Sequence, residues 1–365
     1  MTTPENAITS AVTPARPGGN AARTLSPDFV GNTPRTLDEL AAWTSRKTEA
    51  PLDPDLPIID AHHHLFDDER GKYLAPEMLA EIASGHNIVA TVFLQHKTAY
   101  LTSGPEALRP VGEVAFAADV ARATAGQGVR LCEGIVGHAD LTSGDDVVPA
   151  LEALLEAGQG RLKGIRHGTT WDAGRAGHGR SIERRHLLSD PTFHKGFAQL
   201  SRYGLSFDAW IFHPQLASLE DLLKAFPETP VVLNHCGGIL GVEPHTDRAA
   251  VFATWQQSIQ TLATYPNLRV KLGGLGMLYG GHDFHLQAEP PSSLALADTW
   301  RPYIDACIDA FGPDRAMFES NFPVDKQSCG YGVLWNAFKR IAQPYTSAER
   351  AALFHDTAQA FYRLG

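Results

Sequence analysis

The chain has 365 residues, of which 43% are hydrophobic and 20% charged, and its formal net charge is −10 with neutral histidines. This composition is ordinary for a soluble enzyme, and the acidic balance without a basic run argues against nucleic acid and membrane surfaces as partners. No apolar run is long enough to span a membrane, and the N-terminus lacks the pattern of a secretory signal. Four cysteines without a close pair indicate reduced thiols and a cytoplasmic location. They are Cys132, Cys236, Cys307 and Cys329.

Residues 1–56 are expected to form an N-terminal arm outside the main domain. Residues 1–35 are rich in Thr, Pro, Ala, Gly and Asn and show no apolar periodicity, which is typical of a disordered segment or one that wraps a surface. The sequence 36–39 has the form of a capping box, and it precedes an apolar run at 40–43. A short helix is therefore predicted there.

From residue 57 to residue 365, strand-like apolar runs alternate with segments of helical period. The strand-like runs are 58–60, 88–95, 129–136, 162–166, 205–211, 230–234, 268–272 and 316–319. The helical segments are 76–84, 111–125, 145–157, 191–202, 218–225, 248–264, 293–310, 331–341 and 347–362. This alternation predicts an α/β fold with a parallel sheet, and eight units suit a (β/α)8 TIM barrel. An open doubly wound sheet is less favoured, because no glycine-rich phosphate loop follows the first strand.

The end of the first strand carries the first candidate site. Residues 58–64 read Ile-Ile-Asp-Ala-His-His-His. Side chains alternate along a strand, so His62 and His64 point to one face and His63 to the other. Two imidazoles on one face can share a metal ion or a substrate. The simpler alternative is a polar strand end with solvated histidines.

Polar side chains also follow the later strands. In a barrel of this kind the chemistry takes place at the carboxyl ends of the strands. The stretches at these ends are 95–97, 138–140, 166–167, 213–215, 234–238, 271–274 and 319–325. Histidines outside them, such as His86 and His194, are interpreted as structural or solvated. We expect the strand-end side chains to meet at the mouth of the barrel.

Four stretches in this order resemble the amidohydrolase superfamily. They read Asp-Ala-His-His-His at 60–64, Gly-Ile-Arg-His at 164–167, Asn-His-Cys-Gly-Gly at 234–238 and Ser-Asn-Phe-Pro at 320–323. The branch that the chain resembles most is that of the TIM-barrel metal-dependent hydrolases, which includes sugar lactonases and pyrone-dicarboxylate lactonases. The resemblance spans roughly residues 57–362 and leaves the N-terminal arm outside. The same wider group contains non-oxidative decarboxylases.

The resemblance implies a divalent ion, most often zinc and alternatively manganese. Its candidate ligands are His62, His64 and His213, and His235 is a candidate for a catalytic role or a further ligand. Zinc keeps an open position for water in catalytic sites and lowers the pKa of that water towards about 7. Some lactonases of this branch work without a metal, their histidines binding substrate instead, so a metal-free mechanism stays open.

Arg166 is the principal candidate for substrate binding. Its planar guanidinium fits a carboxylate or an oxyanion, and the alternative is a salt bridge that ties a loop to the barrel. The loops 167–189 and 273–292 are long for connections of this kind, so we expect them to form pocket walls or a lid. Further candidate substrate-binding residues in these regions or at strand ends are Gln95, Tyr100, His167 and Trp171.

Asn321 departs from the family pattern. Many amidohydrolases carry an aspartate at this position, and that carboxylate takes a proton from the attacking water. Asparagine has no titratable group and can only orient or weakly ligate. Asp325 can replace the missing acid, or it can be the N-cap of the following helix. A histidine can also serve as the base, or the substrate can need less base assistance, so Asn321, Asp325 and His235 are the candidate catalytic residues.

The first functional hypothesis is a hydrolase that opens a lactone by metal- or histidine-assisted attack of water. Its partner would be a small molecule, anionic or polyol in character, and a homodimer is one possible assembly. A non-oxidative decarboxylase of an aromatic acid is the second hypothesis, and Asn321 counts against it because that reaction normally uses the strand-eight acid. A cyclic amide hydrolase and a catalytically silent scaffold protein are the third and fourth hypotheses.

Overall fold

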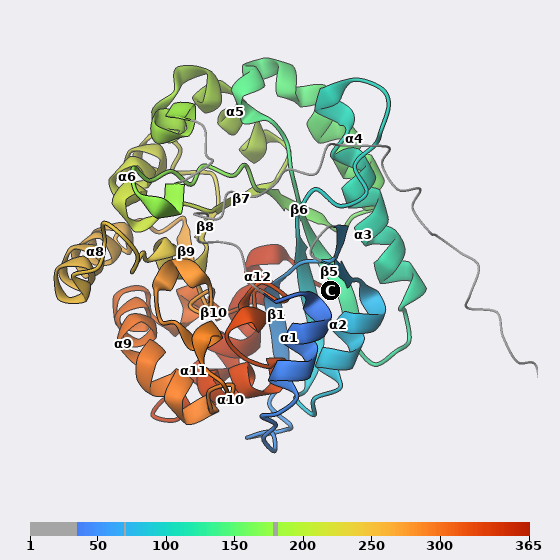
Figure 1. Ribbon diagram of the computed structural model, residues 1–365. Helices are drawn as coiled ribbons and strands as arrows, with labels where there is room; N and C mark the ends of the chain where they lie inside the picture. The colour runs from blue at the N-terminus through green and yellow to red at the C-terminus, as the bar shows by residue number, and fades with distance from the viewer. Residues whose placement is uncertain (1–34, 69–70, 178–181) are drawn as a thin grey trace, which may run out of the picture.

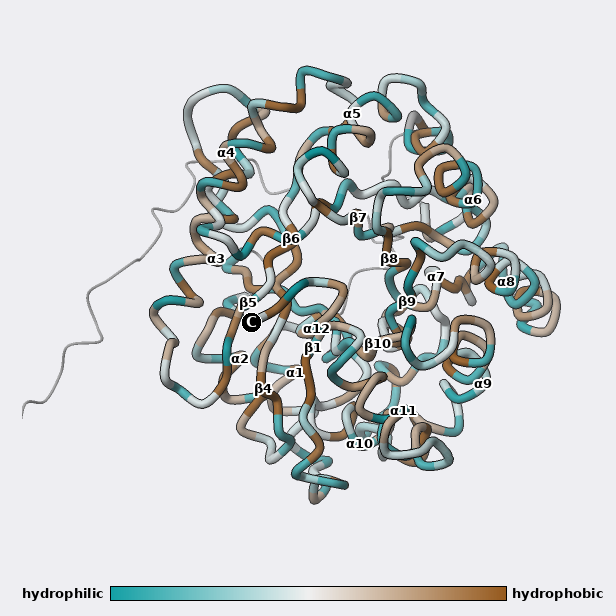
Figure 2. Tube along the Cα trace, turned by 180° about the vertical axis from the view of Figure 1, so that it is seen from behind, coloured by the Kyte–Doolittle hydropathy of each residue, from teal (hydrophilic) through white to brown (hydrophobic). Residues whose placement is uncertain are grey.

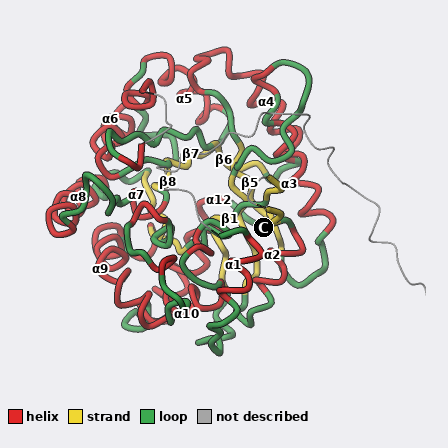
Figure 3. The backbone as a smooth tube through the Cα atoms, in the orientation of Figure 1, coloured by secondary structure: helices red, strands yellow, loops and turns green. Residues whose placement is uncertain are grey.

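A ring of parallel strands with helices outside it organises the molecule. The computed structural model describes residues 35–68, 71–177 and 182–365. Eight strands form one sheet, and the neighbours in the sheet follow one another along the chain. Figures 1 and 3 show these strands as the inner ring, with the helices around them. The strands are β1 (Ile58–His63), β4 (Ile88–Leu94), β5 (Arg130–Gly137), β6 (Leu162–Ile165), β7 (Ser206–Ala209), β8 (Val231–Leu233), β9 (Leu268–Leu272) and β10 (Ala316–Phe318).

The ring closes between its first and last strands. His63 and Phe322 form an isolated parallel bridge. The Asn321 amide donates to the His62 carbonyl at 2.8 Å, and the His64 amide donates to the Phe322 carbonyl at 2.8 Å. The predicted (β/α)8 barrel is therefore confirmed. Its closure brings the strand-one histidines directly beside the strand-eight ending, although about 260 residues separate them along the chain.

The outer helices bury one apolar face each against the ring, as amphipathic helices do. Asp190 caps the helix at Pro191–Arg202 by accepting from the amides of Thr192 and Phe193 at 2.8 and 2.9 Å. Trp255, Trp300 and Trp335 are fully buried between helices and strands. The helices that follow the strands are α2 (Ala75–Ile82), α3 (Val111–Ala123), α4 (Val148–Gly158), α5 (Pro191–Arg202), α6 (Leu216–Ala225), α8 (Arg248–Leu262), α9 (Ser293–Phe311) and α10 (Tyr331–Ile341).

The C-terminal helix closes one end of the barrel interior. The predicted helix 347–362 begins with the expected capping box at Thr346 and consists of α11 (Ser347–Ala351), a π-helical turn and α12 (Thr357–Tyr362). Phe361 and Tyr362 pack in one cluster with inward-facing residues of the strands. Hydrophobic colour runs along β1 and β4 in Figure 2. Arg363 donates to the carbonyl of Gly204, just before β7, so α12 lies at the amino ends of the strands and leaves the opposite mouth open for chemistry.

The described part of the N-terminal arm lies against the barrel and its loops. The predicted short helix is α1 (Leu37–Thr44), and the capping box between Thr36 and Glu39 is confirmed. Trp43 is 2% exposed, and its indole N–H donates to the carbonyl of Ala288 at 3.1 Å. The predictions for residues 1–34 lie outside the described residues. Segment 35–56 is thus in contact with the second long loop of the barrel mouth.

One small element departs from the sequence prediction. An antiparallel hairpin, β2 (Phe66–Asp68) and β3 (Gly71–Tyr73), follows the first barrel strand. Strands of three residues are too short to show a period-two pattern, so composition gives no signal for them. The four cysteines are free and buried. Across the described ranges, no helix combines the length and the apolar character that crossing a membrane requires.

Candidate active site

A buried carboxylate joins two histidines at the mouth of the barrel. Glu319 directly follows β10, His62 lies on β1, and His235 follows β8 after one residue. Glu319 Oε2 lies 2.7 Å from His62 Nδ1, and Glu319 Oε1 lies 2.7 Å from His235 Nδ1. The three side chains are at most 3% exposed. Glu319 is absent from the predicted site residues, although an acid directly after a buried strand is a signal that points to it.

The backbone around His235 is shaped to hold this contact. His235 and Cys236 have φ angles of 56° and 50°, in the left-handed region that non-glycine residues rarely occupy. The His235 amide donates to Glu319 Oε1 at 3.0 Å, so the carboxylate fixes both the backbone and the ring. A Cβ atom at Gly274 would lie 2.4 Å from His235 Nδ1, so only glycine leaves room for the imidazole.

These three side chains fit a divalent ion. They form the one group of His, Cys, Asp or Glu, among the residues that the structure describes, whose ligand atoms all lie within 4.8 Å of one another. His62 Nδ1 and Glu319 Oε2 are close but not aligned as a hydrogen bond, and neither atom has another hydrogen-bond partner within the described ranges. Two imidazole nitrogens and a carboxylate oxygen are also a donor set of catalytic zinc sites. The group contains neither His64 nor His213, so their roles as ligands stay predictions.

His64 and Arg166 approach the other side of His62. His62 Nε2 lies 3.2 Å from His64 Nε2 and 3.2 Å from Arg166 Nη1. His64 Nδ1 donates a hydrogen bond to the carbonyl of Leu94 at 2.9 Å, so in the neutral ring His64 Nε2 is left as an acceptor. Arg166 Nη2 donates to the carbonyl of Gln95 at 2.6 Å. The structure thus brings together the strand-one pair, the strand-four arginine and the strand-two ending.

Burial keeps the histidines of this cluster neutral. It lowers the pKa of His62 and His64 well below the usual range, and positive neighbours such as Lys271 and Arg166 act in the same direction. Burial also lowers the pKa of His235, which Glu319 opposes. Neutral imidazoles retain a lone pair for a proton or a metal ion, so the cluster is ready to act as base or ligand.

Further ionised groups lie beneath the histidines inside the barrel. Lys271 Nζ lies 2.8 Å from Asp208 Oδ2, and both side chains are fully buried. Asn234 Nδ2 and the Tyr362 hydroxyl both donate to Asp208 Oδ2 at 3.0 Å. Buried charges are tolerated only when paired and hydrogen-bonded in this way. The network ties β7, β8, β9 and α12 together directly below the site.

Asp60 holds the two ends of the barrel seam in register. Its carboxylate accepts from the amides of His62 and Ser320 at 3.3 and 2.9 Å, and from the Tyr331 hydroxyl at 2.9 Å. Burial raises the pKa of Asp60 to about 6, and these hydrogen bonds act against that rise. The acid of the strand-one motif is therefore positioned to orient backbone rather than to contact a substrate.

Asn321 and Asp325 lie side by side. Asn321 has a φ of 53°, and its Nδ2 donates to Asp325 Oδ1 at 2.7 Å. The Gly276 amide donates to Asp325 Oδ2 at 2.9 Å. Burial raises the pKa of Asp325 to about 8, against the effect of these two hydrogen bonds. Asp325 is the first residue of a 3-10 turn, Asp325–Gln327, so it does not cap the following helix, and its catalytic role stays a prediction.

His213 belongs to a separate cluster on the neighbouring loops. Its Nδ1 accepts from the Leu240 amide at 3.2 Å, and burial lowers its pKa to about 4. Its ring packs against His245 with centroids 5.0 Å apart, and His245 Nε2 lies 2.7 Å from Asp172 Oδ1. These contacts connect the loops that follow β6, β7 and β8.

Two other predicted substrate-binding residues have structural contacts. His167 Nδ1 accepts from the Leu141 amide at 3.2 Å, and burial lowers its pKa to about 3. The Trp171 backbone amide donates to the Gln215 side chain at 2.8 Å. The Arg185 guanidinium lies 4.9 Å from the centre of the Trp171 indole ring. Their binding roles stay predictions.

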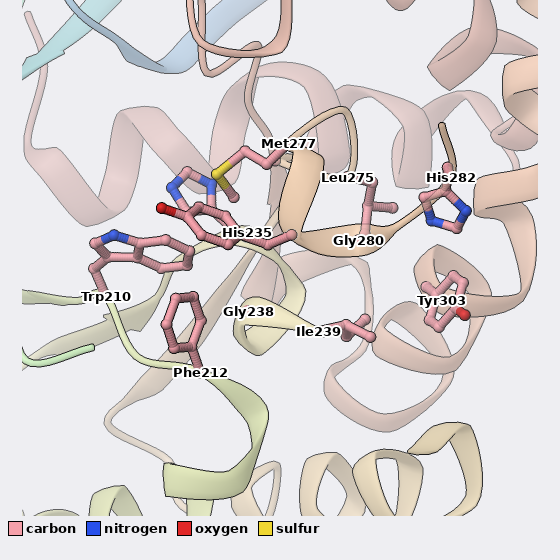
Figure 4. A pocket seen from close by; sticks show the side chains of 12 residues that line it. Trp210, Phe212, His235, Gly238, Ile239, Leu275, Met277, Gly280, His282 and Tyr303 are labelled. Atoms are coloured by element: carbon pink, nitrogen blue, oxygen red, sulfur yellow. The ribbon is translucent and has the colours of Figure 1, made fainter. Parts of the chain in front are cut away.

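An apolar pocket opens beside His235. The Trp210 ring meets the His235 ring edge-on with centroids 4.6 Å apart. Met277 and Tyr279 come from the second long loop, which forms a pocket wall as expected. Figure 4 shows His235 between Trp210 and Met277. The lining residues are Trp210, Phe212, His235, Gly238, Ile239, Gly274, Leu275, Met277, Tyr279, Gly280, His282 and Tyr303.

Comparison with known proteins gives this site a family context. The profile of the family described as amidohydrolase matches residues 59–364. The chain belongs to the amidohydrolase family. The resemblance drawn from the four motifs is therefore confirmed, and this chain is an enzyme of the amidohydrolase type.

Three relatives show how far the likeness extends. An uncharacterized protein, y4mH, of Sinorhizobium fredii is 32% identical over 332 residues, which cover 85% of this amidohydrolase and 99% of the relative. An L-fucono-1,5-lactonase of Burkholderia multivorans is 27% identical, with 84% and 96% covered. The solved structure of an amidohydrolase from Burkholderia multivorans with bound zinc has a TM-score of 0.66 and 23% identity, with 84% and 99% covered. That structure shows the shared fold.

Proposed function

We propose that this amidohydrolase opens a small cyclic ester, a lactone, by addition of water to its carbonyl carbon. The observation that carries the proposal is the buried Glu319 carboxylate, which holds His62 and His235 beside Arg166 at the barrel mouth. Ester hydrolysis needs a base, a cation that stabilises the developing negative charge, and an apolar wall that encloses the reacting group. The likeness to an L-fucono-1,5-lactonase supports the same reaction.

His235 is the residue that we assign to proton transfer. Its Nδ1 is paired with Glu319 Oε1, so its Nε2 is the nitrogen left for water or substrate. In the histidine-assisted route, water attacks the carbonyl carbon and its proton passes to His235 Nε2. The ring C–O bond then breaks, and the departing alkoxide oxygen takes the proton back. The product is an open-chain hydroxy acid, which balances one lactone and one water.

Arg166 is assigned to the charge that develops on the carbonyl oxygen. It lies 3.2 Å from His62 Nε2 and is buried, so solvent does not screen its charge. Burial lowers the pKa of this guanidinium, and nearby carboxylates such as Asp208 oppose the shift. A guanidinium in a protein stays protonated. Arg166 therefore remains a cation at the place where an oxyanion would form.

A divalent ion is the alternative source of the same assistance. His62, His235 and Glu319 would hold it, and when bound it would polarise the carbonyl and lower the pKa of a water ligand. The zinc in the Burkholderia multivorans amidohydrolase supports zinc as the first ion to test, with manganese as the second. Arg166 and the pocket walls keep their roles in either case.

A panel of lactones and aromatic carboxylic acids tests the proposed reaction. Acid release is followed by a pH indicator, and carbon dioxide release is measured in the same samples. We expect acid without carbon dioxide, and only from lactones. Carbon dioxide from an aromatic acid would replace the hydrolase with the decarboxylase. Acid release from cyclic amides alone would select the cyclic amide hydrolase.

A further inference from the structure

Three buried polar atoms beside Arg166 have no hydrogen-bond partner among the residues that the structure describes. They are the Tyr100 hydroxyl, Glu113 Oε2 and Arg166 Nε. Folded proteins leave few buried polar atoms unsatisfied, and each exception asks for an explanation, such as a missing water or ligand. Three such atoms on three different segments therefore point to a group that is recognised in common.

The loop that presents Tyr100 is held in place from two sides. Arg166 Nη2 donates to the carbonyl of Gln95 at 2.6 Å. On the other side, Glu113 Oε1 accepts from the amides of His96 and Thr98 at 2.7 and 2.8 Å. Glu113 is fully buried on α3, so one of its oxygens fixes the loop while the other is left without a partner.

The backbone of this loop is strained. Lys97 and Ala99 have φ angles of 74° and 54°, which residues other than glycine rarely adopt. A Cβ atom at Gly112 would lie 2.3 Å from the carbonyl oxygen of Ala99. Any residue larger than glycine at this position of α3 would therefore clash with the loop. Strain of this kind persists where the surrounding structure enforces it, and it is concentrated at functional sites. Here it fixes the position of Tyr100.

The three side chains also act on one another electrostatically. After burial, the Glu113 carboxylate is the largest cause that raises the pKa of the Tyr100 hydroxyl, and Arg166 lowers it. Burial raises the pKa of Glu113 to about 7, and Arg166 is among the groups that lower it. The three groups therefore lie within reach of one another's charges.

Arg166 connects this cluster to the reaction centre. Its Nη1 lies 3.2 Å from His62 Nε2, and the guanidinium is a rigid plane that also carries Nε. A group bound at Nε and a group beside His62 therefore contact the same guanidinium. When the carbonyl oxygen of a six-membered lactone faces one nitrogen of this guanidinium, the substituent next to the carbonyl carbon is the nearest one that can reach another nitrogen.

We propose that Tyr100, Glu113 and Arg166 bind one hydroxyl group of the substrate, on the carbon next to the lactone carbonyl. A substrate hydroxyl can donate to Glu113 Oε2 and accept from Arg166 Nε or the Tyr100 hydroxyl. One such group therefore gives a partner to the acceptor on Glu113 and to the donors on Arg166 and Tyr100. The carboxylate of Glu113 disfavours a second carboxylate at this place. The inference rests on the proposed lactone hydrolysis, and it specifies a hydroxylated lactone instead of a lactone that carries a carboxylate there.

The test compares a hexono-1,5-lactone with its 2-deoxy counterpart, which lacks only that hydroxyl. Wild-type protein is expected to prefer the hydroxylated lactone at least about tenfold in kcat/KM, because its hydroxyl forms hydrogen bonds to charged groups. Tyr100→Phe and Glu113→Gln are expected to lose this preference, because each variant loses more kcat/KM with the hydroxylated lactone than with the deoxy lactone. Tyr265→Phe is the matched control, because the Tyr265 hydroxyl donates at 3.0 Å to Glu220 on the outer helix α6.

Each other outcome contradicts the inference. If both variants lose activity equally on the two lactones, the residues only support the fold. If wild-type protein shows no preference, a structural water occupies the place between the three side chains. If wild-type protein hydrolyses neither lactone, the proposed function fails, and calorimetric binding of the same two compounds decides the subsite separately. Tighter binding of the hydroxylated lactone that Tyr100→Phe abolishes would support it, and equal binding would overturn it.

Discussion

At the scale of single residues, the site depends on how Glu319 divides its two oxygens. One oxygen contacts His62 and the other contacts His235 and its amide, so one side chain sets the orientation of two rings. Carboxylates that orient histidines in this way commonly fix the tautomer and increase basicity. Arg166 then supplies the positive charge on the far side of His62.

Glu319→Gln tests this arrangement. The amide keeps the shape of the side chain but removes the charge that both imidazoles face. We expect kcat on a lactone to fall at least about 100-fold with little change in thermal stability. Steady-state kinetics and circular dichroism measure the two effects. Glu220→Gln is the control, because Glu220 pairs with Lys224 on an outer helix, and equal activity in both variants would remove Glu319 from the mechanism.

Asp325→Asn separates catalysis from stability. We expect turnover to fall far more than substrate binding, because Asp325 accepts the hydrogen bond that orients Asn321. Kinetic measurement of kcat and KM shows this difference. Full turnover in the variant would show that the hydrogen bond between Asn321 and Asp325 does not contribute to catalysis.

The raised pKa of Asp325 predicts a pH-dependent stability. Folded Asp325 releases its proton near pH 8 and unfolded Asp325 near pH 4, so the folded state binds the extra proton between these values. Its contribution to stability is complete below pH 4 and is lost as the pH rises towards 8. Asp325→Asn is therefore expected to gain stability relative to wild type from pH 5 to pH 8, measured by urea unfolding. Asp298→Asn, at an exposed aspartate, is the control. Curves of unfolding free energy against pH that run parallel for Asp325→Asn and wild type would contradict the raised pKa of Asp325.

At the scale of elements, helices and loops outside the ring support the mouth. The segment 35–56 contacts the loop that follows β9, and that loop supplies Met277 and Tyr279 to the pocket wall. At the other end, α12 closes the barrel and its Tyr362 hydroxyl donates to Asp208 below the histidines. Segment 35–56 and α12 therefore support opposite ends of the barrel.

Trp43→Ala tests the support from the N-terminal segment. The substitution removes a buried indole and its hydrogen bond to Ala288, so we expect a loss of about 3 kcal/mol in unfolding free energy. We also expect KM to rise several-fold, because the loop after β9 loses a contact. Chemical denaturation and kinetics measure both. An unchanged KM would mean that this segment contributes to stability alone.

At the scale of the whole molecule, the barrel gathers residues from all parts of the chain at one mouth. His62 lies on β1, and His235 and Glu319 follow β8 and β10. The closed ring leaves these side chains at one end of the barrel while α12 fills the other. Burial at that mouth keeps the imidazoles neutral. This is the state in which histidine binds a metal ion or accepts a proton.

The metal content of purified protein distinguishes the two forms of assistance. We expect about one divalent ion per chain by elemental analysis, and a lower thermal midpoint after a chelator removes it, because a ligand of the folded state stabilises that state. His62→Ala should lose both the ion and the chelator effect. Protein that holds no ion and gains no activity with zinc or manganese would establish the histidine-assisted route.

The sequence by itself determined the alternation of strands and helices, because hydrophobic periodicity is a local property. It also placed candidate site residues at strand ends, since the barrel topology dictates which end of each strand meets the others. Only the tertiary structure decided which of these residues touch. Glu319 meets His62 and His235, while His213 belongs to another cluster, because such contacts depend on barrel closure and on backbone angles at His235 that no local pattern encodes. The role proposed for Glu113 also depends on tertiary structure. This helix residue is buried, with one oxygen lacking a hydrogen-bond partner among the described residues, because α3 packs against the loop that follows β4.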